Sequence, residues 1–178
     1  IALGSSEGVG YIDENGNITG WLNELAFVPV DLNPTAPIDE WSGDRGCGVQ
    51  YFSQEAVIRL APKAGIILDE TQTPAEKLRY VQKLASKGDE GARKIFETIG
   101  CYMAYGIAYY ADFYDIKHVL LLGRVTSGDG GNIILKKAAE VLNVEFPNLT
   151  ARVKIHLPDE SSRRVGQAVA AASLPALK

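Results

Sequence analysis

The first quarter of the chain alternates short apolar runs with tight turns. We expect strands in "IALGSS" and on both sides of the turn in "VGYIDENGNITGW". Asn15-Gly16 predicts a hairpin with a type I′ turn, in which both central residues have positive φ. Ser5–Gly8 predicts a second reversal, so the segment is expected to form an antiparallel meander. Residues 28–40 hold three of the chain's eight prolines, which excludes a helix there.

After residue 51 the apolar positions recur with the period of a helix. Ser53 is expected to cap the first helix. Thr73 caps a second, with Pro74 at its first position and Gly88 at its stop. A longer helix follows over about 89–114, and its mixture of small and aromatic residues suits close packing against a sheet.

Strands and helices alternate over the last third. Apolar residues 119–122 predict a buried strand, a glycine-rich loop follows, and a helix begins near Gly131. Residues 151–157 predict another strand, and a last helix is expected to start at Ser161 or Ser162. Three antiparallel strands followed by this alternation predict an α/β fold, with a mixed sheet and helices on both faces.

Composition narrows the possible partners. Charged residues make up 22% of the 178 residues and apolar residues 46%, as in a globular domain. A net charge of -4 argues against a nucleic-acid surface, and no apolar run approaches bilayer length. Two cysteines are too few for a disulfide scaffold or a four-thiolate zinc site, so we expect a cytoplasmic protein.

The first candidate site is the hairpin turn in "LGSSEGVG". Hydroxyls and backbone N–H groups of such a turn suit phosphate oxygens, which makes Gly4, Ser5, Ser6 and Gly8 candidate nucleotide ligands. An ordinary tight turn explains the same residues. Glu7 in this turn argues against phosphate binding unless its carboxylate points away.

The second candidate site is "LLLGRVTSGDGGN", between a strand and a helix. Ligands of open α/β sheets lie beyond the carboxyl ends of strands, so Gly123, Arg124 and Gly128 are candidate nucleotide ligands. The loop has neither the Walker A nor the G-x-G-x-x-G spacing. Arg124 would stack on a base or pair with phosphate, although a surface arginine is the simpler interpretation.

Together, the two loops resemble the second half of the sugar kinase, Hsp70 and actin superfamily, and within it the ROK family of sugar kinases and sugar-responsive repressors. That family typically has Leu-Gly-Thr-Gly-x-Gly-x-Gly at its phosphate hairpin. Leu3, Gly4, Gly8 and Gly10 match it, while serines replace Thr and one Gly. The resemblance continues through residues 88–123 and ends at "VGQAVAAA", so it covers nearly the whole chain.

The resemblance implies a ribonuclease H-like, actin-like ATPase domain, with residues 1–178 forming a single C-terminal lobe and an N-terminal lobe outside this chain. It further implies that the complete protein binds a sugar and ATP with Mg²⁺ and transfers a phosphoryl group. The catalytic base would belong to the other lobe, so this lobe alone would be inactive and carries no catalytic residue. The alternative is a non-catalytic ROK-like regulatory or ligand-binding module. The recurring tyrosines of residues 102–110 suit either a core or a homodimer face.

The resemblance also identifies what is missing. ROK proteins usually bind zinc through one His and three Cys, but this chain has Phe27, Glu40 and Ser42 at three of those positions and keeps only Cys47. We therefore expect no zinc. Of the family's hexose contacts, Glu24 remains, whereas Phe27 and Val49 replace polar residues.

Overall fold

The computed structural model describes residues 1–19, 23–159 and 162. The described strands are short, and the helices carry most of the packing. The elements, in chain order, are β1 (Ala2–Leu3), β2 (Glu7–Gly8), η1 (Leu25–Phe27), η2 (Gly48–Gln50), α1 (Gln54–Leu60), η3 (Pro62–Ala64), α2 (Pro74–Ser86), α3 (Glu90–Tyr110), β3 (His118–Leu120), η4 (Arg124–Thr126), α4 (Asp129–Glu145), α5 (Pro147–Thr150) and β4 (Lys154–His156).

Two ladders meet to form a mixed sheet. β1 pairs antiparallel with β2, and β3 pairs parallel with β4. A parallel bridge between Ala2 and Leu122 joins the ladders, and the Ile1 carbonyl, just before β1, accepts a hydrogen bond from the Leu122 N–H at 2.9 Å. The predicted mixed α/β fold is confirmed at this level. The predicted helix after Ser161 lies outside the described residues.

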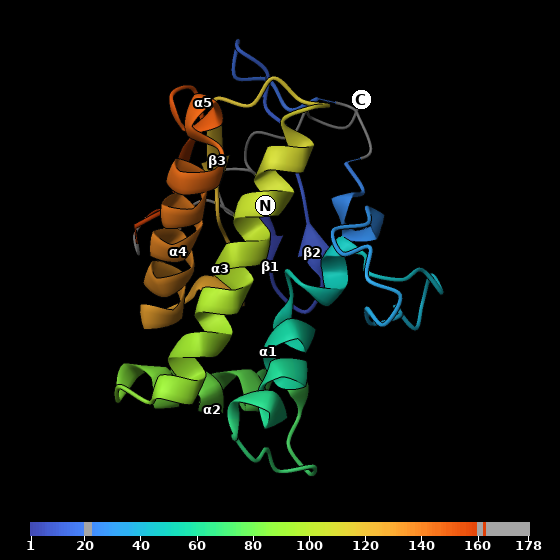
Figure 1. The fold of residues 1–178 in the computed structure, drawn as a ribbon, viewed down its shortest axis with the longest axis vertical. Coiled ribbons are helices and arrows are strands. Elements are labelled where there is room, and N and C mark those ends of the chain that lie inside the picture. The colour runs from blue at the N-terminus through green and yellow to red at the C-terminus, as the bar shows by residue number, and fades with distance from the viewer. Residues whose placement is uncertain (20–22, 160–161, 163–178) are drawn as a thin grey trace, which may run out of the picture.

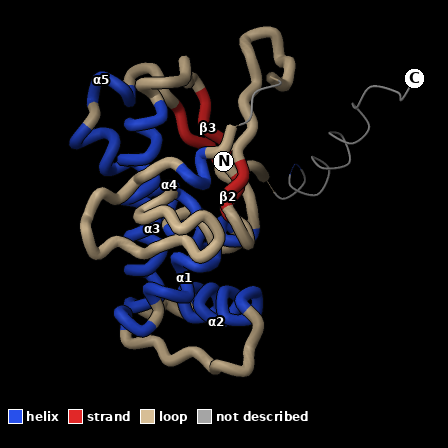
Figure 2. The backbone as a smooth tube through the Cα atoms, turned by 90° about the vertical axis from the view of Figure 1, so that its right-hand side faces the viewer, coloured by secondary structure: helices blue, strands red, loops and turns tan. Residues whose placement is uncertain are grey.

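The two longest helices cover one side of these strands. α3 and α4 run side by side, with α2 crossing below them (Figure 1), and the rotated view places the strands to one side of both helices (Figure 2). A Cβ on Gly100 of α3 would lie 2.7 Å from the Ile134 carbonyl oxygen of α4, so the missing side chain permits this close approach. Val119 and Leu121 are buried in the same core.

Local signals set the helix starts as the sequence predicts. The Ser53 hydroxyl accepts from the Glu55 N–H at the start of α1, and Thr73 forms a capping box with Glu76 at the start of α2. Gly88 has φ of 82° just beyond α2. None of the described helices is long and apolar enough to cross a bilayer.

The second N-terminal turn differs from its prediction. Gly16 has φ of 83°, but no non-glycine residue in the described parts of the chain has positive φ, so the turn is not type I′. The Asp13 carboxylate instead accepts from the Asn15 and Asn17 N–H groups. This favours a three-residue loop, in which only the glycine is left-handed. Among the described residues, a bridge between Ile12 and Ile18 and the flanking backbone hydrogen bonds close the loop, so the pairing is shorter than the expected meander.

Candidate functional site

The hairpin between β1 and β2 presents hydroxyls to solvent. Ser5 and Ser6 are exposed at its tip, and the Gly4 N–H donates to the Ser6 carbonyl at 3.0 Å, which closes the turn tightly. The Gly4 carbonyl accepts from the Gln54 N–H at 2.8 Å, so the turn is anchored to the start of α1. The turn is therefore anchored to α1 by its backbone, while its two serines remain accessible from solvent.

Glu7 points away from the tip. Its side chain is 6% exposed, and neither carboxylate oxygen has a hydrogen-bond partner. Burial raises the pKa of Glu7 to about 8. The serine hydroxyls of the turn thus lie at the surface while the Glu7 carboxyl lies in the core. Glu7 therefore does not argue against phosphate binding at this turn.

The glycine-rich loop lies directly against this hairpin. The Leu3 N–H donates to the Leu122 carbonyl at 2.9 Å, and a Cβ on Gly123 would lie 2.3 Å from the Leu3 carbonyl oxygen. Gly123 also has φ of 93° and ψ of 174°, a conformation that belongs almost entirely to glycine. The two loops, about 120 residues apart in sequence, therefore contact each other, and we name the pair the joined loops.

The rest of the loop is held by α2. Gln82 donates through Nε2 to the carbonyls of Arg124, at 2.7 Å, and Ser127, at 3.4 Å. The Arg124 side chain and Gly128 are exposed, and Gly128 precedes α4 with φ of 63°. Sequence reasoning missed Gln82, because its role depends on the position of α2 and on no local motif.

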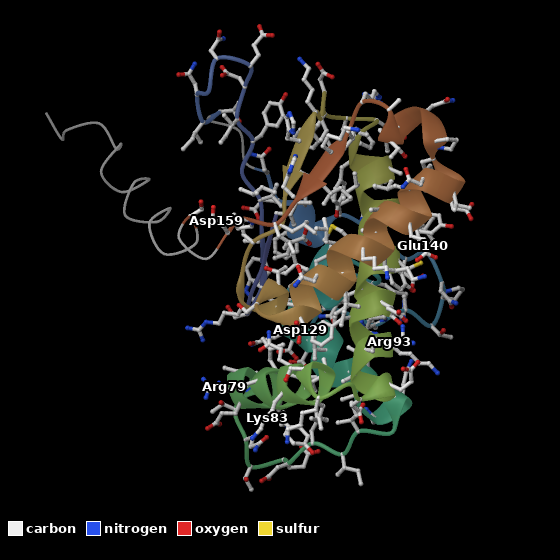
Figure 3. All side chains as sticks on the ribbon, turned by 90° about the vertical axis from the view of Figure 1, so that its left-hand side faces the viewer. Arg79, Lys83, Arg93, Asp129, Glu140 and Asp159 are labelled. Carbon is white, nitrogen blue, oxygen red and sulfur yellow. The ribbon has the colours of Figure 1, made fainter. Side chains whose placement is uncertain are left out.

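The charges around the loop are mixed. Asp129 stands at the start of α4, where its carboxylate disfavours a second anion. Arg79 and Lys83 of α2 lie on the same side of the molecule (Figure 3), and both are exposed. The start of α4 is thus less favourable for an anion than the serine hairpin, which has no exposed carboxylate at its tip.

The predicted sugar contact lies near the hairpin. Glu24 is exposed and precedes η1. A Cβ on Gly48 would lie 2.3 Å from Glu7 Oε2 and 2.6 Å from the Leu25 carbonyl, so Gly48 fits between β2 and η1. This glycine, which no sequence motif identifies, lets the segment that carries Glu24 pack against the hairpin.

The knuckle at residues 39–47 is closed by hydrogen bonds. The Asp39 carboxylate accepts from the Ser42 N–H at 2.8 Å and from Gln50 Nε2 at 3.2 Å. Cys47 is fully buried, and burial raises the pKa of its thiol, which disfavours the thiolate that a metal needs. Phe27 stacks on Trp41 with ring centroids 5.3 Å apart. Phe27, which stands where the family has its zinc-binding His, thus contacts an aromatic ring.

We predict that the purified full-length protein contains no stoichiometric zinc. One buried thiol with a raised pKa does not hold a tetrahedral ion. In the described ranges, no group of three or more His, Cys, Asp or Glu is placed to bind a metal. Elemental analysis of protein purified without chelators and dialysed against metal-free buffer measures the content, and one zinc per chain would contradict this interpretation of the knuckle.

Comparison with known proteins agrees with this architecture. The sequence matches the family model for the ROK family over residues 21–173. The structure is similar to a ROK family glucokinase from Streptomyces griseus, solved in complex with glucose and AMPPNP (TM-score 0.64, 19% identity, covering 88% of this chain and 53% of that chain). It is also similar to a ROK family transcriptional regulator, a homologue of the E. coli MLC protein (TM-score 0.69, 16% identity, 94% and 43%).

The chain spans about half the length of these two solved proteins, with 53% and 43% of their chains covered. At such identities the likeness concerns the fold. No curated protein matches the sequence.

Proposed function

The chain belongs to the ROK family, and from this membership we propose that it is the C-terminal, actin-like lobe of a two-lobed sugar kinase homologue. The complete protein would transfer the γ-phosphoryl group of ATP to a sugar hydroxyl. The observation that carries the proposal is the contact between Leu3 and Gly123, because it unites a serine hairpin with a glycine-rich loop. We place the protein in the cytoplasm, since Cys47 and Cys101 are both free thiols.

The residues of the joined loops fit a nucleotide. Bound ATP with Mg²⁺ would supply the phosphoryl group and part of the charge neutralisation. The exposed hydroxyls of Ser5 and Ser6 would donate to phosphate oxygens, with Gly4 and Gly8 letting the backbone come close. Arg124 would pair with phosphate or stack on the base, between Gly123 and Gly128.

The residues at the family's hexose-contact positions favour a protein that accepts fewer sugars than a typical ROK kinase. Glu24 is exposed and would accept from a sugar hydroxyl, whereas the Phe27 ring is engaged with Trp41 and Val49 carries no polar group. A regulatory or ligand-binding module is the second candidate, favoured by these apolar replacements. The two candidates differ in whether nucleotide turnover occurs.

We predict that the full-length protein phosphorylates glucose poorly. Each lost hydrogen bond to a hydroxyl costs about 1–3 kcal/mol, so two losses lower kcat/KM by roughly one and a half to four decades. A coupled ADP-release assay with glucose, N-acetylmannosamine, fructose and a no-sugar control measures this. Turnover of glucose at about 10⁴ M⁻¹s⁻¹ or more would show that the residue matching at Phe27 and Val49 is wrong.

The same assay separates the two candidate functions. ADP release above the no-sugar control with any of the sugars supports the kinase. ADP release equal to the control with every sugar, together with measurable sugar binding, supports the regulatory module and contradicts the kinase.

A further inference from the structure

A cavity is formed by residues outside the joined loops. It has a volume of about 260 Å³ and lies between the 31–37 loop, α1 with η3, and α3. Its apolar walls include Pro37, Leu60 and Ile99. The volume is slightly below the range of pockets for drug-sized molecules, so it suits a small metabolite.

One end of the cavity is built around Asp31. Its carboxylate accepts from the Tyr51 hydroxyl at 2.6 Å, the Tyr102 hydroxyl at 3.2 Å and the Asn33 N–H at 2.9 Å. The hydrogen bond from Tyr51, first among these contacts, lowers the pKa of Asp31. The two tyrosine rings are 4.4 Å apart. The acid is thus satisfied by protein donors and has little need of a ligand.

Two cations also line the cavity. The Arg59 guanidinium lies over the Tyr51 ring, with its central carbon 5.2 Å from the centroid, and donates through Nη2 to the Gln50 carbonyl. Lys63 is exposed. Within the described residues, neither cation has a carboxylate within salt-bridge distance. The cavity lining therefore carries two positive charges, on Arg59 and Lys63, and one negative charge, on Asp31, which already accepts three hydrogen bonds.

We propose that this cavity binds a small oxyanion, a carboxylate or phosphate group carried by a compact metabolite. Arg59 and Lys63 would hold the anionic group, because their N–H groups are the donors left over once Asp31 is satisfied. Pro37, Leu60 and Ile99 would contact the apolar part of the ligand. Arg59 is already fixed by Tyr51 and Gln50, so its guanidinium is held in place before binding.

Isothermal titration calorimetry of the full-length protein tests the proposal, with sodium succinate in one arm and inorganic phosphate in the other. NaCl keeps the ionic strength constant. The phosphate arm uses a Ser5→Ala/Ser6→Ala background, so that the hairpin does not contribute. We expect one saturable site per chain in at least one arm, and the arm that saturates tells a carboxylate site from a phosphate site.

Two variants locate the binding. Lys63→Gln should weaken affinity about threefold to tenfold, and Arg59→Lys about tenfold, because lysine lacks the planar fork. Lys63 makes no described hydrogen bond, so its variant should fold normally, and Lys87→Gln on α2 is the matched control with unchanged affinity. The proposal fails if neither arm saturates, if Lys63→Gln and Arg59→Lys both bind as the wild type does, or if Lys87→Gln weakens binding equally.

Discussion

Replacing Gly123 by alanine should destabilise the full-length protein by about 2–6 kcal/mol. The φ of 93° with ψ of 174° costs a non-glycine residue about 1–3 kcal/mol. The new Cβ would also lie 2.3 Å from the Leu3 carbonyl oxygen and 2.7 Å from the Leu3 nitrogen, and relieving such overpacking costs about 1–3 kcal/mol more. Both contacts are backbone atoms of β1, so the strand itself must shift.

Gly128→Ala is the matched control for this prediction. Gly128 has φ of 63° and ψ of -150°, a similarly restricted conformation, but a Cβ there would meet nothing within 4 Å. It should therefore cost only the backbone term of about 1–3 kcal/mol. Chemical denaturation followed by circular dichroism measures both variants. Equal destabilisation of the two would contradict the contact between the hairpin and the loop.

The free energy of unfolding of the wild-type protein should decrease as pH rises, because Glu7 is protonated in the folded chain. Burial raises the pKa of Glu7 from 4.5 to about 8, so the folded chain keeps a proton that the unfolded chain releases. The contribution of Glu7 is fully present below pH 4.5 and is lost by about pH 8. Each pH unit between these limits lowers the free energy of unfolding by roughly 1.4 kcal/mol. By pH 7 the accumulated loss is about 3 kcal/mol.

Glu7→Gln should remove this dependence, because the amide does not ionise. The free energy of unfolding, measured by denaturation at several pH values from 5 to 8, should therefore fall less steeply in the variant. Glu14→Gln, a change at an exposed glutamate of the neighbouring turn, should leave the wild-type slope intact. Parallel curves for wild type and Glu7→Gln would show that Glu7 is ionised in the folded protein.

Local signals predicted the helices well. The caps at Ser53 and Thr73 depend only on residues within one turn, and the structure confirms both. The type I′ turn at Asn15-Gly16 was wrong, because the Asp13 side chain binds two N–H groups and favours another loop. The dipeptide signal contains no information on that side chain.

The candidate site was only partly predictable. The sequence identified Ser5 and Ser6 in one loop and Gly123 in another as candidate ligands. Only the family resemblance suggested that both loops bind the same nucleotide. Their contact through Leu3, the burial of Glu7 against Gly48 and the support from Gln82 are all non-local, and no residue spacing encodes them. Helix caps are easier to predict than the candidate site, because a cap depends on residues within one turn of sequence. The site depends on contacts between segments that only the folded chain brings together.

The most direct test of the account is nucleotide binding to the hairpin. Isothermal titration calorimetry of ATP–Mg²⁺ into the full-length protein should show one site. Ser5→Ala/Ser6→Ala should weaken it by about 1–3 kcal/mol, or roughly fivefold to 150-fold, because hydrogen bonds to phosphate oxygens are lost. Ser86→Ala, at an exposed serine of α2, should bind as the wild type does. Equal affinity of the wild type and the double variant would contradict the account and would assign the hairpin a structural role alone.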